Sequence, residues 1–142
     1  MPRLLLLNHV VLLLCSSIYL GTGISLVVFL APVAAASHFF TAMTIVMLVC
    51  GLIMLATEWL SGLRWVPVVV LIAVILATGL TMFAITPLNA KITAGTSDLA
   101  ELKTMVLQWA HLVRVRAVLW TVEWIAMAYW FYRLTLQARA DR

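Results

Sequence analysis

Charged residues are scarce in this 142-residue chain, because aspartate, glutamate, lysine and arginine together make up only 10% of it. Soluble globular domains carry about 25% charged residues, so the composition excludes a soluble fold. Hydrophobic residues make up 65% of the chain instead, and apolar runs longer than about 18 residues are typical of membrane spans. We therefore predict an integral membrane protein. The small net charge of +4 comes from basic residues at span ends, as membrane topology requires, so no nucleic-acid partner is expected.

Cysteine and cofactor motifs are also scarce. Cys15 and Cys50 each lie within an apolar run, outside any CxxC or Cys/His cluster, so we expect small buried hydrophobic side chains rather than metal ligands. The sequence has no GxGxxG loop, no HExxH motif and no histidine pair at metal spacing. We therefore expect no metal and no cofactor. The N-terminal apolar run is similar to a signal peptide but continues to Ala36, which favours an uncleaved first span.

We predict a single all-α transmembrane domain over residues 1–142, an integral membrane four-helix bundle. The few glycines and prolines mark the boundaries between its spans. Gly62 breaks the helix between the second and third spans, and Pro87 ends the third span. A capping-box-like pair, Asp98 and Glu101, begins the last helix. That helix could continue to about residue 139, roughly 60 Å, so it must extend beyond a hydrocarbon core of about 30 Å. The expected spans are about 4–34, 38–60, 65–85 and 106–136, with a polar connection over 86–98.

Basic residues set the expected orientation. With four spans, both termini and the connection between the second and third spans share one side of the membrane. That side holds five basic residues: Arg3, Arg64, Arg133, Arg139 and Arg142. The other side holds Lys91 and Lys103, with Arg114 and Arg116 at the mouth of the last span. The positive-inside rule then favours both termini in the cytoplasm, in a bacterial inner membrane.

The last span carries polar residues that an apolar environment makes costly. The segment WAHLVRVRAVLWTVEW, residues 109–124, contains Glu123 near the middle of the span. Arg116 lies seven residues earlier on the same helical face, about 10 Å away along the axis. Intramembrane charges usually face the interior and pair. Glu123 is therefore either a proton-transfer carboxylate or ligand anchor, or half of a structural pair with Arg116.

Other polar residues leave two interpretations each. Arg114 and Arg116 either snorkel to the headgroups or form a positive pocket for an oxyanion, a phenolate or a lipid phosphate. His111 is either tolerated at the interface or acts as an acid or base near neutral pH. Asn89, just beyond the expected helix break, either caps freed backbone groups or points into a cavity mouth.

A polar stripe in the first span has the same ambiguity. Asn8, Cys15, Tyr19 and Thr22 recur at helical spacing, flanked by His9, Ser16 and Gly23. Packing inside the bundle is the simpler interpretation. In the alternative, the stripe lines a pocket opposite the last span, to which Tyr19 or His9 contributes.

The chain resembles the anthrone-oxygenase-like family of small membrane proteins in its four-span layout and in three segments: GTGISLVVFLAP, TPLNAKI and WAHLVRVRA. On this resemblance Pro87 and Asn89 stand where the family has its Pro and Asn, and Trp109 matches its Trp. The family arginine corresponds to Arg114 or Arg116, and the spacing leaves both open. Members tied to polyketide pathways oxidise an anthrone to an anthraquinone with molecular oxygen and no known metal or flavin, whereas most members have no assigned function.

Two functions follow as expectations. The resemblance implies a cofactor-independent oxidation of a hydrophobic aromatic or phenolic substrate, with Glu123 or His111 moving the proton. Asn89, Trp109, Arg114, Arg116 and Tyr19 would then bind the substrate. The alternative is a non-enzymatic accessory, lipid-binding or transport protein. Expected partners are membrane lipids, a small hydrophobic aromatic molecule and a second copy of the chain in a homo-oligomer.

Overall fold

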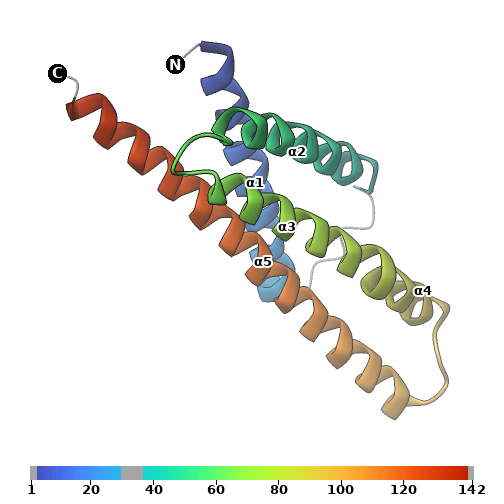
Figure 1. Cartoon of the computed structure of the whole chain (residues 1–142). Helices are drawn as coiled ribbons and strands as arrows, with labels where there is room; N and C mark the ends of the chain where they lie inside the picture. Colours follow the sequence, from blue (N-terminus) through green and yellow to red (C-terminus); the bar gives the residue numbers. More distant parts are fainter. Residues whose placement is uncertain (1–2, 30–36, 141–142) are drawn as a thin grey trace.

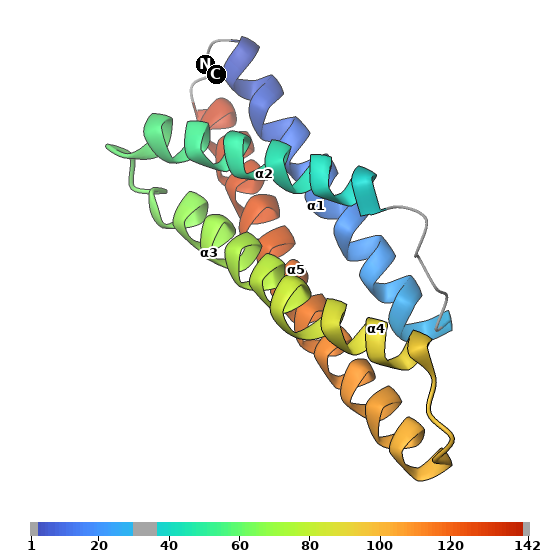
Figure 2. The same ribbon diagram turned by 90° about the vertical axis from the view of Figure 1, so that its right-hand side faces the viewer.

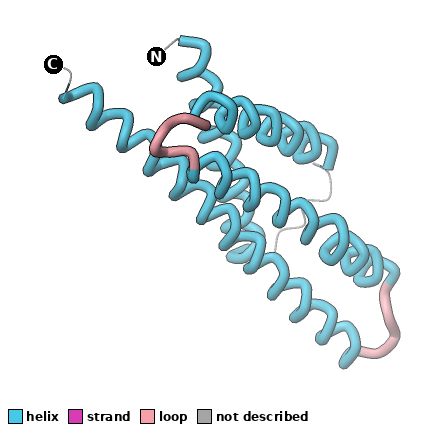
Figure 3. Tube along the Cα trace, viewed as in Figure 1, coloured by secondary structure: helices cyan, strands magenta, loops and turns pink. Residues whose placement is uncertain are grey.

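The computed structural model describes residues 3–29 and 37–140, and the side chains of residues 4–22 and 41–137. The chain forms helices α1 (Arg3–Phe29), α2 (Ser37–Glu58), α3 (Trp65–Leu80), the π-helical turn η2 (Thr81–Ile85), α4 (Thr86–Ala94) and α5 (Leu99–Ala140) (Figure 1). The elements α3, η2 and α4 follow one another without a break, so the described residues form four long helical segments (Figure 3). The described residues contain no strand, and the predicted all-α class is confirmed.

Each long helix packs against two others. Helix α1 contacts α2 and α5, and α3 contacts the same two helices from the other side. Successive helices run in opposite directions, so the start of α1, the α2–α3 connection and the end of α5 lie at one end of the molecule (Figures 1 and 2). Short loops between antiparallel neighbours are the usual way to close such a ring of helices.

The distribution of side chains is that of a protein surrounded by lipid. Large apolar residues are exposed on α1, α2, α3 and α5, among them Ile18, Ile45, Ile75 and Ile125, while the polar His9, Ser16 and Glu123 are buried. In water such an apolar surface would be a liability. Three helical stretches are long and apolar enough to cross a membrane: Leu4–Thr22, Thr41–Glu58 and Trp65–Ala94. These observations support a membrane protein. The predicted fourth span, 106–136 in α5, is not among those stretches.

The third helix is longer than the sequence predicted. The expected polar connection over 86–98 is wrong, because the helix continues through Pro87 to Ala94 and only residues 95–98 are non-helical. The π-helical turn explains the difference: the backbone N–H of Thr86 donates to the carbonyl of Thr81 in a five-residue step. Pro87 then occupies the first turn of α4, where its missing N–H removes no required hydrogen bond.

The last helix is the single long element that the sequence predicted. It has 42 residues, which is about 63 Å at 1.5 Å per residue. At its start the backbone N–H of Ala100 donates to Asp98 Oδ1 at 2.9 Å. The carboxylate of Glu101 accepts a hydrogen bond from the Thr96 hydroxyl, so Glu101 does not complete the predicted capping box. The last residues of the predicted first span, 30–34, lie outside the described residues.

Helices α2 and α3 approach closely at Gly51, which predicts a sensitive position. A Cβ atom at Gly51 would lie 2.8 Å from Leu71 Cδ2 and 3.2 Å from its Cγ. We expect Gly51→Ala to cost about 1–3 kcal/mol through overpacking. The measurement is the midpoint of thermal unfolding of the detergent-solubilised protein. Gly79→Ala is the control because no atom lies within 4 Å of its Cβ position. Equal midpoints for the two variants would contradict the close approach.

Candidate functional site

The polar interior of the molecule lies along the seam between α1 and α5. The buried residues of this seam have the same 3, 4, 3 spacing on the two helices. They are His9, Leu12, Ser16 and Tyr19 on α1, and Trp120, Glu123, Met127 and Trp130 on α5. Because the helices are antiparallel, the first of one set faces the last of the other. The sequence of each helix therefore fixes one register for the pair.

Aromatic contacts close both ends of this seam. The His9 ring stacks on Trp130 with centroids 4.1 Å apart, and the Tyr19 ring lies 4.9 Å from Trp120 at a tilt of 44°. Buried aromatic pairs of this kind contribute about 0.5–1.5 kcal/mol beyond their area. His9 Nδ1 is 2.6 Å from the Leu5 carbonyl oxygen, so it carries the proton and donates. The ring is thereby fixed in orientation.

Glu123 lies in the middle of the seam and is 0% exposed. Its Oε1 is 2.5 Å from Ser16 Oγ, which is also 2.9 Å from the Leu12 carbonyl oxygen. A serine hydroxyl has one hydrogen and cannot donate fully to both acceptors. Both contacts become hydrogen bonds when the carboxyl group is neutral, donates to Ser16 Oγ, and Ser16 donates to Leu12. An ionised carboxylate would be costly here, so the geometry favours the neutral acid.

Arg116 does not pair with Glu123, which corrects the partner predicted from the helical face. Its Nη1 donates to Thr81 Oγ1 at 3.2 Å, its guanidinium carbon lies 4.7 Å from the Trp120 ring centroid, and its buried Nε has no partner. Seven residues along a helix separate the two backbones by about 10 Å, and each side chain finds a nearer partner on a neighbouring helix. Arg116 therefore points inward without a counter-ion among the described residues.

Tyr19 joins Arg116 around the same indole ring. It is 7% exposed, and its hydroxyl oxygen is 2.5 Å from Thr44 Oγ1 on α2. Trp120 thus has the phenol ring of Tyr19 and the guanidinium of Arg116 as neighbours. Of the predicted site residues, the structure brings Tyr19, Arg116 and Glu123 to one seam, and we refer to these three with Ser16, Thr81 and Trp120 as the seam site.

The remaining predicted site residues lie elsewhere. Asn89 is exposed on α4, and His111 and Arg114 are exposed on α5. Trp109 is half-buried and packs on the small apolar cluster of Ile85 and Val113. His111 precedes Glu123 by 12 residues, about 18 Å along the helix. Asn89 was expected in a loop, but because the helix continues through α4 it lies on an exposed helical face.

Ser16, Thr81 and Trp120 were not among the predicted site residues. For Ser16 and Trp120 a signal existed, because the matched spacing of polar and aromatic residues in α1 and α5 identifies facing positions. Thr81 had no local signal, since its position at the start of η2 depends on the π-helical turn. The thiols of Cys50, which is buried, and Cys15, which is half-buried, are free, and both pack in the main apolar core as predicted.

Comparison with family models, with curated proteins and with solved structures finds no match to this chain. The chemistry of the seam site therefore rests on its own geometry.

The neutral state of Glu123 predicts distinct effects of two substitutions. Glu123→Gln keeps a donor for Ser16 Oγ and should change the unfolding midpoint little. Ser16→Ala leaves the buried carboxyl group without its partner and should cost about 1–3 kcal/mol. The measurement is thermal unfolding in detergent, with Thr121→Ala as a control, because Thr121 is exposed and its hydroxyl donates to the Ala117 carbonyl of its own helix.

Infrared spectroscopy tests the protonation state directly. The wild-type protein should show a carboxylic acid C=O band near neutral pH that Glu123→Gln removes. Loss of a carboxylate band instead would show that Glu123 is ionised and that the proton assignment is wrong.

Proposed function

We propose that α5 crosses the membrane together with the other three long helices, with both termini in the cytoplasm. The support is the register of the seam: residues Trp120 to Trp130 of α5 lie beside His9 to Tyr19 of α1, within a stretch apolar enough to span. The outward face of α5 is also apolar over this region, with Val115, Val118, Val122 and Ile125 exposed. A helix at that depth with an apolar outer face satisfies its backbone internally, as a lipid environment requires.

We further propose that the seam site binds a hydrophobic aromatic substrate as its enolate or phenolate and promotes its oxidation by molecular oxygen. One observation carries this proposal: Arg116 is turned inward beside Trp120 and Tyr19 and has no carboxylate partner among the described residues. An uncompensated guanidinium in a low-dielectric interior favours an anionic ligand. The indole and phenol rings beside it suit an aromatic one. The resemblance to anthrone oxygenases suggests the same substrate class.

The reaction balances without a further reductant. The substrate gives a proton to water and binds as the enolate, which Arg116 stabilises. The enolate carbon gives electrons to dioxygen and forms a C–O bond, while neutral Glu123 donates its proton to the distal oxygen to give a hydroperoxide. The Glu123 carboxylate then takes the proton from the same carbon, the O–O bond breaks, and a carbonyl forms as hydroxide leaves. Hydroxide and the first proton give water, so one anthrone and one dioxygen yield one anthraquinone and one water.

Oxygen consumption with an added anthrone tests this proposal. In detergent micelles or proteoliposomes, the wild-type protein should accelerate oxygen uptake above the protein-free rate. Arg116→Gln should lower the catalysed rate by about a hundredfold, because the enolate loses its stabilising charge. Lys103→Gln is the charge-matched control, since Lys103 is exposed near the start of α5, and its rate should equal that of wild type.

Two outcomes would overturn the assignment. If the wild-type protein accelerates oxidation of no anthrone or related quinol, the oxygenase function is wrong. If Arg114→Gln lowers the catalysed rate about a hundredfold and Arg116→Gln leaves it unchanged, the anion binds outside the seam site.

A further inference from the structure

Two cavities meet at the end of the molecule that holds the α2–α3 connection. The first, which we call the end pocket, has a volume of about 900 Å³ and is lined by Leu5, Glu58, Ser61, Gly62, Leu63, Trp65, Tyr129, Trp130, Arg133, Leu134 and Gln137. The second, which we call the side groove, has a volume of about 480 Å³ and lies between α1 and α2. Leu5 lines both. The end pocket, which has charged side chains in its lining, and the largely apolar side groove therefore adjoin at this residue.

The end pocket presents two opposite charges that do not pair with each other. Glu58 accepts a hydrogen bond from the Ser61 hydroxyl at 2.5 Å, which holds the carboxylate at the end of α2. Arg133 is exposed on α5 and makes no hydrogen bond or ion pair with the described residues. Trp65 on α3 and Tyr129 on α5 also line the pocket, with ring centroids 5.4 Å apart. The pocket thus offers an acceptor for a cation, a donor for an anion, and aromatic faces.

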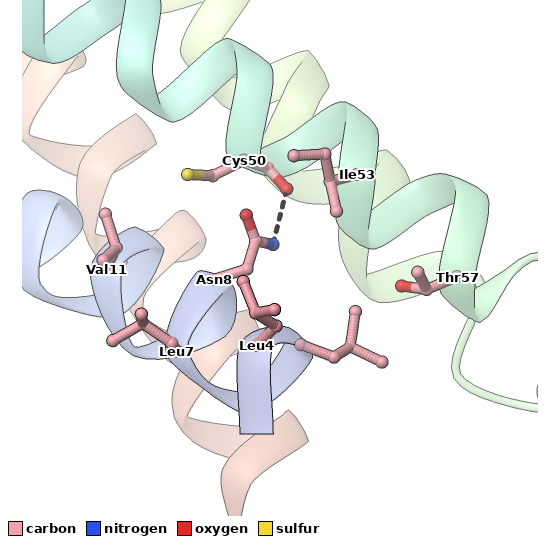
Figure 4. A pocket seen from close by; sticks show the side chains of 8 residues that line it. Leu4, Leu7, Asn8, Val11, Cys50, Ile53 and Thr57 are labelled. Atoms are coloured by element: carbon pink, nitrogen blue, oxygen red, sulfur yellow. Dashed lines mark hydrogen bonds between the residues drawn. The ribbon is translucent and has the colours of Figure 1, made fainter. Parts of the chain in front are cut away.

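The side groove is almost entirely apolar. Figure 4 shows Leu4, Leu7, Val11 and Ile53 around it, on α1 and α2. Its polar side chains already have partners: Asn8 Nδ2 donates to the Cys50 carbonyl at 3.1 Å, and the Thr57 hydroxyl donates to the Met54 carbonyl at 3.0 Å. Beyond the Asn8 amide oxygen and the Cys50 thiol, the groove offers a hydrophilic ligand little to bind, and it suits a hydrocarbon chain.

We propose that the end pocket and the side groove together bind a zwitterionic amphiphile, with a primary ammonium and a phosphate in its headgroup and an acyl chain as its tail. The phosphate contacts Arg133, the ammonium contacts Glu58 and the aromatic faces of Trp65 and Tyr129, and the chain passes Leu5 into the side groove. Ethanolamine phospholipid has this chemistry. The site is separate from the seam site and does not depend on the proposed oxidation.

The charges predict a specific order of lipid binding. An ethanolamine headgroup has N–H donors for Glu58 and a phosphate for Arg133. A choline headgroup has a cation without N–H donors, which keeps only the aromatic contact. A glycerol headgroup has no cation at all and leaves Glu58 unpaired. We therefore expect ethanolamine phospholipid to bind most tightly of the three.

Native mass spectrometry of the detergent-purified full chain tests this order, with lipids of identical acyl chains. Glu58→Gln should lower the affinity for ethanolamine phospholipid by about tenfold, the loss of one charge-assisted hydrogen bond, and leave glycerol phospholipid unchanged. Arg133→Gln should lower the affinity for all three lipids. Arg64→Gln is the matched control, because Arg64 is exposed at the same end but does not line the end pocket, and it should bind like wild type.

A second comparison separates a lipid from a free zwitterion of the same headgroup. Phosphoethanolamine alone should bind far more weakly than the phospholipid, and Leu5→Trp, which fills the junction, should weaken only the phospholipid. Equal affinities for the headgroup and the lipid would show that the side groove takes no chain and would overturn the amphiphile.

Thermal unfolding of each variant without lipid shows whether it remains folded. For a folded set, equal effects of Arg64→Gln and Arg133→Gln would mean that lipids respond to surface charge alone and would overturn the site. Retention of full ethanolamine selectivity in Glu58→Gln would do the same.

Discussion

The contact between Ser16 and Glu123 joins the first helix to the last, and much of the interior depends on it. It is a polar contact in an apolar core, so a shift of either helix by one residue would rotate the partner away by about 100° and leave a carboxyl group in hydrocarbon. The rings of His9 and Trp130 lie about two turns from it along the same seam. The contact therefore sets a register that apolar packing alone would leave loosely specified.

The same contact bears on the charge of the interior. A neutral carboxyl group, which the Ser16 contacts favour, does not compensate a cation, so the guanidinium of Arg116 beside Trp120 is left without a counter-charge among the described residues. In a structural ion pair the two charges would cancel and the interior would have no use for an anion. The protonation state of Glu123 therefore distinguishes a structural ion pair from a site that binds an anion.

The helices could be predicted from the sequence because apolar runs and Gly62 are local signals. The contacts in the interior could not, because they depend on which residues the neighbouring helices bring opposite each other. The sequence identifies Glu123 as a candidate because a carboxyl group in the middle of a long apolar helix cannot reach water. It does not identify the partner of Glu123, because a helical face shows which residues share a side and not what the facing helix carries. Pro87 was mistaken for a helix end, because the π-helical turn that accommodates it depends on hydrogen bonds five residues apart rather than on any residue type.

The two proposed sites take different ligands because different side chains surround them. Over the stretches that are apolar enough to span a membrane, the outward faces carry large exposed apolar side chains, which give a polar ligand few hydrogen-bonding partners. The two proposed sites differ from these faces, because the seam site holds the guanidinium of Arg116 and the end pocket is lined by both Glu58 and Arg133. A planar aromatic anion suits the first because Trp120 and Tyr19 stand beside the charge. A zwitterion suits the second because Glu58 and Arg133 can each contact one of its charges, and its chain would pass into a groove that is almost entirely apolar.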